Sequence, residues 1–469
     1  MDDELAGAPA TWLAARLRSG DVSAREVLDA HLDRIGSVNG TVNAIVTLEP
    51  ERAREDAAAA DERLARGGPP GPLHGLPIAI KDLVQTRGIR TTFGSPIYAD
   101  NVPDTDDLLV ERIRRAGAVV IGKTNTPEWG AGSHTFNPVF GVTRNPADPT
   151  RSAGGSSGGA AAALALGMVP IADGSDLGGS LRNPASFCGI VGFRPSPGRV
   201  PSWPTDDPTD DLSVEGPMGR SVEDAALLLS AIAGPDPRIP ISLPDDGAVF
   251  GPPLDVDVVG TRVAFAPSGD GVMPFEPDIV HTVTSAGRIL ERLGCTLVDA
   301  FPDLAGARDA FLTLRARAYA RDLGPLLERE RGRMKATVVW NVEAGLALTP
   351  DDVDRAVATK TAIHDRVDAF FSRIDVLAMP VTQVPPFPAE LEYPTEVAGV
   401  PMATYLDWMA SCWTITVTGL PAISVPCGFT PDGLPVGLQL VGRRGGDLPL
   451  LRLAHAFEGA ADLEDRRPT

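Results

Sequence analysis

Three short segments carry the residue types that nucleophilic catalysis requires. Residues 71–82 contain an apolar run that ends in Lys81, residues 154–159 read GGSSGG, and residues 174–184 place Ser180 after a pair of glycines. A serine hydroxyl is a poor nucleophile unless a neighbouring base takes its proton, and a lysine is such a base only when it is neutral. We therefore consider the three segments together as candidates for one site.

The apolar residues before Lys81 offer a way to make that lysine neutral. At the reference pKa of about 10.4, roughly one lysine in two thousand is neutral near pH 7. Burial beside the apolar run 76–80 lowers the pKa toward about 7 to 8 by desolvation. Such a shift costs about 3 to 4 kcal/mol, at about 1.36 kcal/mol per pKa unit. We expect a core large enough to absorb that cost.

The elements that must position these segments alternate between helices and strands. Residues 9–66 have apolar residues at helical spacing and predict helices, which the Gly/Pro-rich residues 67–72 end. Residues 76–220 predict short strands with helices such as 107–116 and 160–166 between them. Further strands are predicted at 258–265, 296–298, 375–381 and within 422–441, with a helix at 278–293 and a helical stretch around 304–371. This alternation is typical of an α/β sheet covered by helices, and no linker interrupts it.

One motif matches the sequence pattern of a phosphate-binding loop, but its residues do not favour the conformation of such a loop. Residues 117–124 read GAVVIGKT and satisfy the pattern G-x-x-x-x-G-K-[ST]. The middle residues are apolar and mostly β-branched, so they predict a buried strand. Asn125-Thr126-Pro127 stands where the helix of a phosphate loop should begin. We do not expect nucleotide binding here.

A second motif offers a different nucleophile. Residues 154–158 match G-x-S-x-G, the nucleophile elbow of α/β-hydrolases, which would make Ser156 the nucleophile and require a histidine. His281, His364 and His455 lie downstream, none in a distinctive setting, and a Pro-rich loop precedes the motif where a strand is expected. A Ser-His hydrolase that uses Ser156 is one alternative.

The composition excludes several other classes of protein. A net charge of −20 without a basic patch argues against nucleic-acid binding. The four cysteines form no Cys-x-x-Cys pair, so neither a disulfide framework nor a zinc site is indicated. The start is acidic, and the longest apolar run, residues 160–172, is too short to span a bilayer. We expect a cytoplasmic protein without metal, cofactor or membrane contact.

Taken together, the motifs resemble those of the amidase signature family over nearly the whole chain. They are GPLHGLPIAIKD from residue 71, AGAVVIGKTN from 116, GGSSGG from 154, DLGGSLR from 176, FCGIVG from 187, GLPAISVPCG from 419 and GLQLVGR from 437. The resemblance implies a single domain, residues 1–469, on a large mixed, twisted central β-sheet with α-helices on both faces. Within it lie a helical N-terminal region (1–70), a signature core (71–220) and the remainder (221–469).

The resemblance also implies a role for each candidate residue. Ser180 would be the nucleophile, Ser156 a bridging serine entered through a cis peptide bond, and Lys81 the ultimate base. The implied oxyanion and substrate-binding residues are Leu177, Gly178, Gly179, Trp129 and Gly130. The implied reaction is hydrolysis of a carboxylic amide through an acyl-enzyme, with esters and carbamates also accessible.

Departures from the family pattern bear on the substrate. In glutamyl-tRNA amidotransferases, the amidase chain continues after the nucleophile with a Tyr-rich segment that ends in L-D-Q-[IV]-G-P, whereas residues 201–217 here read PSWPTDDPTDDLSVEGP. We therefore expect a stand-alone enzyme, monomer or homodimer, acting on a small-molecule amide; the glutaminase chain of such an amidotransferase is the alternative. By resemblance, five aromatic residues belong to segments near the pocket and predict a neutral, partly aromatic or apolar acyl group: Trp129, Phe136, Phe140, Trp408 and Trp413.

Overall fold

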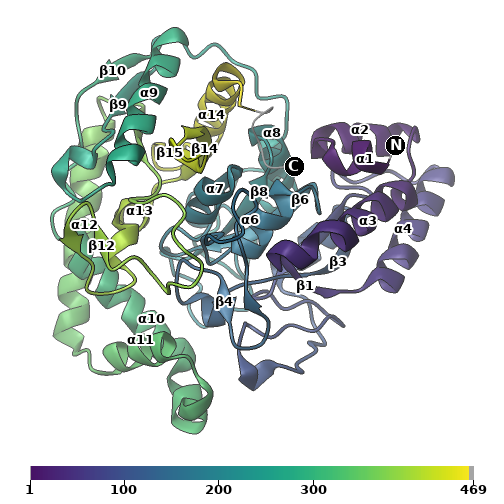
Figure 1. Ribbon diagram of the computed structural model, residues 1–469, viewed down its shortest axis with the longest axis horizontal. Helices are drawn as coiled ribbons and strands as arrows, with labels where there is room; N and C mark the ends of the chain where they lie inside the picture. Colours follow the sequence, from purple (N-terminus) through teal and green to yellow (C-terminus); the bar gives the residue numbers. More distant parts are fainter. Residues whose placement is uncertain (1, 464–469) are drawn as a thin grey trace.

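The computed structural model describes residues 2–463, in which helices surround a mixed β-sheet of eight strands (Figure 1). The strand order is β10-β9-β11-β15-β14-β7-β8-β6. β10, β9 and β11 run parallel, and the other neighbours pair antiparallel. The strands are β6 (Ile171–Asp176), β7 (Val191–Arg194), β8 (Val214–Gly219), β9 (Arg262–Phe265), β10 (Thr296–Val298), β11 (Val376–Pro380), β14 (Ala422–Phe429) and β15 (Pro435–Val441).

Helices cover both faces of this sheet, as the family resemblance implies. A side chain at Gly216 of β8 would meet Leu181, next to α7, whereas one at Gly219 would meet Ala225 in α8. Because these glycines are three residues apart and side chains alternate along a strand, α7 and α8 lie on opposite faces. α6 packs on α7, while α14 packs on α8 and α9. The bounds are α6 (Gly158–Ala165), α7 (Arg182–Cys188), α8 (Val222–Ile232), α9 (Pro277–Arg292) and α14 (Asp447–Ala461).

A second sheet of three strands carries the lysine segment. β3 (Val119–Thr124) lies between β1 (Ile45–Leu48), which is antiparallel to it, and β2 (Pro77–Lys81), which is parallel. β3 is the segment whose letters match a phosphate loop, and it is the buried strand that its apolar residues predict. β2 also packs beside β6, so this sheet adjoins the edge of the large one.

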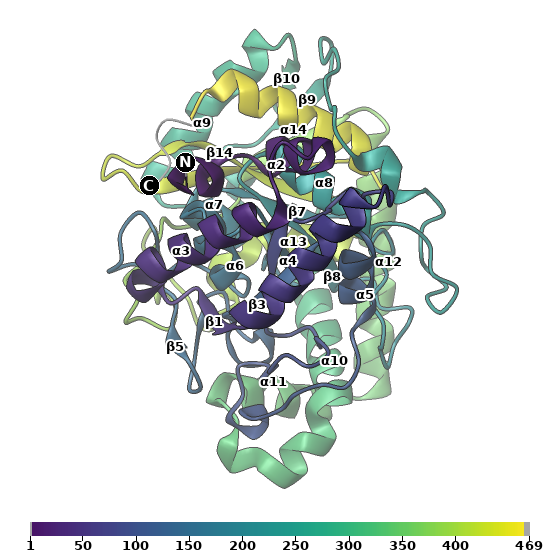
Figure 2. The same ribbon diagram turned by 90° about the vertical axis from the view of Figure 1, so that its right-hand side faces the viewer.

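The N-terminal region is helical except for β1. Its helices are α1 (Asp2–Gly7), α2 (Ala10–Ser19), α3 (Ala24–Val42) and α4 (Pro50–Ala65). Figure 2 shows α3 and α4 beside β1 and β3. The prediction of helices throughout residues 9–66 is therefore wrong at Ile45–Leu48. Four residues between two helices are too few to show a periodicity, and their pairing with β3 decides their conformation.

The predicted helical stretch around 304–371 is confirmed. It comprises α10 (Ala307–Glu330), α11 (Ala336–Leu346) and α12 (Pro350–Phe371). The remaining elements are α5 (Leu108–Arg115), α13 (Ala410–Thr418) and the two-stranded pairs β4 (Phe136–Asn137) with β5 (Gly141–Val142) and β12 (Glu396–Val397) with β13 (Val400–Pro401). None of the helices within residues 2–463 combines the length and the apolar character that crossing a membrane requires.

Candidate active site

Lys81, the last residue of β2, is wholly buried, and its amine is surrounded by hydroxyl groups. Nζ lies within hydrogen-bond distance of three hydroxyl oxygens: Ser156 Oγ at 2.8 Å, Ser157 Oγ at 2.8 Å and Ser175 Oγ at 3.0 Å. Within the described residues, no carboxylate forms an ion pair with this amine. Hydroxyl groups both donate and accept, so three of them can satisfy a neutral amine, which has two N–H donors and one lone pair.

The surroundings of Lys81 favour that neutral form. Burial lowers the pKa of Lys81 from its ordinary value to about 7, although the negative charges of Asp173, Asp176 and Glu215 act in the opposite direction. This value agrees with the effect that the apolar run before the lysine predicts. An amine with a pKa near 7 is partly neutral at neutral pH and can accept a proton there.

Ser156 lies in a loop that is held from two sides. The peptide bond between Gly155 and Ser156 is cis. Ser133 Oγ donates to the Gly155 carbonyl at 2.7 Å, and Thr135 Oγ1 donates to the Gly154 carbonyl at 2.8 Å. α6 begins two residues after Ser156 and is buried along its whole length. The loop therefore presents Ser156 from a rigid base.

Ser180 lies in the turn that connects β6 to α7. Asp176, at the end of β6, accepts from the main-chain N–H of Gly179 at 2.9 Å and of Leu181 at 3.2 Å, which fixes this turn on both sides of Ser180. Arg182 Nε also donates to the Asp176 carboxylate, at 3.0 Å. Although burial raises the pKa of Asp176, the guanidinium of Arg182 and a second one hold it well below its ordinary range. Asp176 is therefore a charged anchor for the turn.

The two loops meet at one cavity of about 550 Å³, which Ser156, Ser175 and Ser180 all line. The Ser157 N–H donates to the main-chain carbonyl of Ser180 at 3.3 Å, so the loops are also in direct contact. No hydrogen bond between the Ser156 and Ser180 hydroxyls is formed in the part of the chain that the structure describes.

The predicted oxyanion and substrate-binding residues divide into two groups. Leu177, Trp129 and Gly130 line the cavity, whereas Gly178 and Gly179 do not. A side chain at Gly130 would lie 3.6 Å from Ser156 Oγ, which places this glycine directly against the hydroxyl. The Gly179 N–H is engaged by Asp176, so it is not directed at a substrate.

Aromatic side chains form one wall of the cavity. Phe93 and Trp129 stack with ring centroids 4.7 Å apart, and Tyr98 meets both rings edge-on. Tyr319 of α10 also lines the cavity, and its hydroxyl donates to the Trp129 carbonyl at 3.3 Å. Sequence reasoning missed Phe93, Tyr98 and Tyr319, because nothing in their local sequence indicates which way they face.

Four of the five aromatic residues predicted near the pocket lie outside this cavity. Trp408 packs against Phe187 in the core, and Trp413 stacks on Phe311 with 5.2 Å between ring centroids. Phe136 and Phe140 are also absent from the lining, so Trp129 is the one member of the predicted set that lines this cavity. For Trp408 and Trp413, the sequence does not distinguish a buried aromatic residue in a large core from one at a cavity wall.

A Ser-His site on Ser156 finds no support in the geometry. No histidine is among the residues of the described chain that line the cavity, and the partner of Ser156 is Lys81. His364 Nε2 lies 2.9 Å from the Val417 carbonyl, and His455 lies on α14. The Pro-rich segment before Gly154 is irregular rather than a strand.

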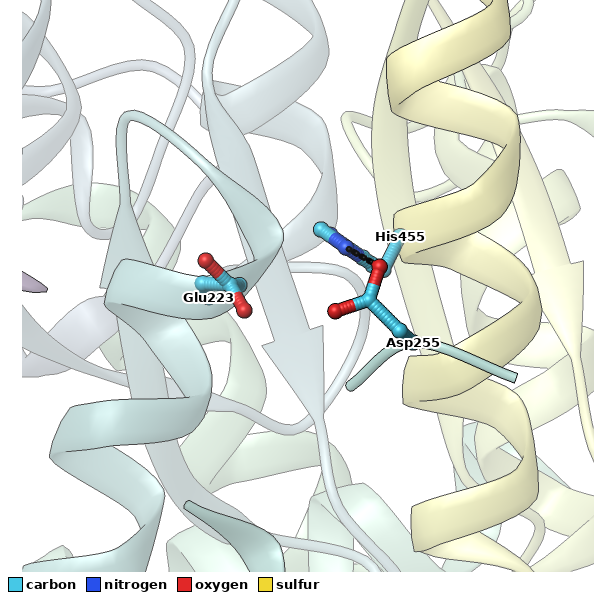
Figure 3. A group of neighbouring side chains, drawn as sticks. All are labelled: Glu223, Asp255 and His455. Carbon is cyan, nitrogen blue, oxygen red and sulfur yellow. Dashed lines mark ion pairs between the residues drawn. The ribbon is translucent and has the colours of Figure 1, made fainter. Parts of the chain in front are cut away.

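One group of metal-ligating residue types occurs elsewhere in the described chain. Ligand atoms of Glu223, Asp255 and His455 lie within 4.8 Å of one another, outside the cavity (Figure 3). Asp255 is exposed, and its carboxylate lies 3.6 Å from His455 Nε2. Glu223 is in the first turn of α8, where the helix dipole favours a carboxylate. The pairing of His455 with Asp255, and the position of Glu223 at the start of α8, explain why these three residues lie together.

The chain is similar to known proteins over nearly its whole length. The family model described as amidase matches residues 26–451. The chain is 38% identical over 479 residues to the A subunit of the glutamyl-tRNA(Gln) amidotransferase from Synechococcus sp. (strain CC9605), covering 97% of this chain and 96% of that protein. It is 36% identical over 462 residues to an acylamidase from Rhodococcus erythropolis, covering 98% and 96%.

Solved structures show the same similarity in three dimensions. A bacterial aryl acylamidase of the amidase signature enzymes superposes with a TM-score of 0.91 and 29% identity, covering 98% of this chain and 97% of that one. The A subunit of glutamyl-tRNA(Gln) amidotransferase from Thermotoga maritima superposes with a TM-score of 0.75 and 30% identity, covering 93% and 91%.

Proposed function

The chain belongs to the amidase family and is a hydrolase of carbon–nitrogen bonds in amides, and we propose that it acts as a stand-alone amidase through an acyl-enzyme on Ser180. One observation carries this proposal. The wholly buried amine of Lys81 lies 2.8 Å from Ser156 Oγ, at a cavity that Ser180 also lines. A hydroxyl between a neutral amine and a second hydroxyl can pass a proton from one to the other.

In the proposed first step, Ser180 Oγ attacks the carbonyl carbon of the amide. The Ser180 proton passes to Ser156 Oγ while the Ser156 proton passes to Lys81 Nζ, so the amine becomes an ammonium. This step requires the Ser180 hydroxyl to turn toward Ser156. The tetrahedral intermediate then expels the amine, which receives a proton back from Lys81 through Ser156. Water repeats the sequence on the ester, releases the acid and regenerates Ser180.

The negative charge of the tetrahedral intermediate needs N–H donors. Because Asp176 engages the Gly179 N–H and Gly178 does not line the cavity, the proposed oxyanion hole relies first on the amide of Leu177, which does. The turn before Ser180 requires a glycine at position 179. Gly179 has φ of +113°, and a side chain there would lie 2.5 Å from Cys412 Cβ. Rigid donors of this kind stabilise an oxyanion without reorganising during the reaction.

The aromatic wall supports a neutral substrate with an apolar or aromatic group. Phe93, Tyr98 and Trp129 offer ring surfaces next to the proposed nucleophile. The structural similarity to an aryl acylamidase supports the same substrate class. The glutaminase chain of an amidotransferase remains the second candidate, since one such chain shares 38% identity with this protein.

A substrate panel tests the proposed function. The purified chain is assayed with aryl and alkyl amides, esters and carbamates, and the released amine is quantified, with free glutamine as the matched aliphatic, charged substrate. We expect aryl amides to be hydrolysed by the chain alone, eluting as a monomer or homodimer in gel filtration. Activity on glutamine alone, or only with an added partner chain, would favour the amidotransferase role.

The nucleophile is tested separately. After reaction with a sulfonyl fluoride, intact mass and peptide mapping locate the modified serine. We expect modification at Ser180, abolished in Ser180→Ala. Modification at Ser156 would reject the proposed triad.

A further inference from the structure

Asp173 of β6 is a fully buried carboxylate next to the lysine of the proposed site. Its Oδ1 accepts the main-chain N–H of Lys81 at 3.0 Å. Its Oδ2 is buried and has no hydrogen-bond partner among the described residues. The side chain therefore joins the end of β2 to β6, where the two sheets adjoin, and leaves one oxygen unsatisfied. An unsatisfied buried carboxylate oxygen in a native protein calls for an explanation.

The other acidic groups near Lys81 differ from Asp173 in their contacts. The Asp176 carboxylate is held by Arg182 and Arg194 and by two main-chain N–H groups. Glu215, opposite Ser175 in the neighbouring strand β8, is half-buried as a residue, but its Oε2 is also buried without a hydrogen-bond partner among the described residues, and burial raises its pKa to about 8. Asp173 lacks such compensation by direct contact, because no ion pair joins it to a cation in the described chain. Burial raises the pKa of Asp173, whereas the Lys81 main-chain N–H and the positive charges of Lys123, on β3, and Lys81 lower it, so the carboxylate and the two buried lysines influence one another's charge.

We propose that Asp173 is a positioning residue for Lys81: one oxygen fixes the end of β2, and the charge of its carboxylate sets how readily the Lys81 amine takes up a proton. This inference rests on the proposed role of Lys81 as the base. Burial alone weakens an amine as a base, and a nearby negative charge restores part of its proton affinity. Asp173 thereby keeps Lys81 basic enough to accept the proton that Ser156 passes on.

A merely structural role for Asp173 predicts a different result from a charge role. The titratable groups around Lys81 are Asp173 and Asp176 from β6 and Glu215 from β8, with Lys123 on β3 and Asp82 after β2 beyond them. Asp173→Asn retains an oxygen that can accept the Lys81 N–H but removes the negative charge. Asp82→Asn is the matched control, since Asp82 is equally buried and follows Lys81 directly, but its carboxylate contacts Thr92.

The experiment is the pH profile of kcat/KM for an aryl amide, measured for the wild type and both variants, with melting temperatures as the check on folding. For Asp173→Asn we expect the midpoint of the acid limb to move to lower pH by about one unit or more. For Asp82→Asn we expect the wild-type midpoint. Should Asp173→Asn fail to fold, Asp173→Ser, which also retains an acceptor, is measured in its place.

Two outcomes separate this inference from the proposed function. A folded Asp173 variant with the wild-type midpoint, or an equal displacement in the Asp82 control, overturns the role of Asp173. The proposed function survives either of these results, provided that Lys81→Met is inactive in the same assay. An active Lys81→Met would reject the base itself, whatever the Asp173 variants show.

Discussion

At the scale of single residues, the pKa of Lys81 sets the pH range that the proposed mechanism predicts for the enzyme. The amine acts as a base only when it is neutral, and burial lowers its pKa to about 7. We therefore expect kcat/KM for a neutral amide to rise with pH and to level off above about pH 8, with a midpoint near 7. Rates measured between pH 5 and 9 check this. A profile that stays flat through pH 7 would contradict it.

Replacing Lys81 by methionine tests the base directly. Methionine fills a similar space without an ionisable group, so we expect kcat to fall by about 10²-fold to 10⁴-fold, while the melting temperature is retained. Lys123→Met is the matched control. Lys123 is also wholly buried at the end of a neighbouring strand, but it contacts Val84 and Thr86 and does not line the cavity. Equal losses of kcat in both variants would mean that Lys81 acts through the fold alone.

At the scale of elements, α6 packs closely enough to require small residues. A side chain at Gly159 would lie 2.3 Å from the Asn125 main-chain nitrogen. We expect Gly159→Ala to lower the free energy of unfolding by about 1 to 3 kcal/mol through overpacking. Gly36→Ala in α3, where nothing lies within 4 Å, should raise it by about 0.5 to 1 kcal/mol because alanine favours helix. Denaturant unfolding of both variants measures the contrast; equal effects would contradict the packing argument.

The aromatic wall of the cavity is built by elements that lie far apart in the chain. Phe93 and Tyr98 follow β2, whereas Tyr319 comes from the middle of α10. The Tyr319 hydroxyl joins the two parts through the Trp129 carbonyl. The shape of the proposed substrate pocket therefore depends on how α10 packs against the loop after β2.

At the scale of the whole molecule, one hydrophobic core contains residues from Leu5 to Phe457. On this basis we keep the prediction of a single domain and expect one cooperative unfolding transition. Scanning calorimetry checks it, since the calorimetric and van't Hoff enthalpies agree when a chain unfolds as one unit. Two resolved transitions, with residues 1–70 melting apart from the rest, would show a division into separate units.

The family and the α/β class could be predicted from the order of residues, and the segments of the candidate site were chosen on the same basis. Lys81, Ser156 and Ser180 each lie in a short motif whose residue types follow from local requirements: apolar neighbours for a neutral lysine, and glycines for tight turns. Most helices and strands were predicted for the same reason, since periodicity is a local property.

Which side chains meet depends instead on packing in three dimensions. β1 is a strand because β3 offers it a partner, and Phe93 rather than Trp408 faces the cavity because of how distant elements pack. The contact of Asp173 with Lys81 joins residues 92 positions apart in the chain and requires β2 to lie beside β6. Such contacts are set by packing over the whole core, and no local pattern encodes them.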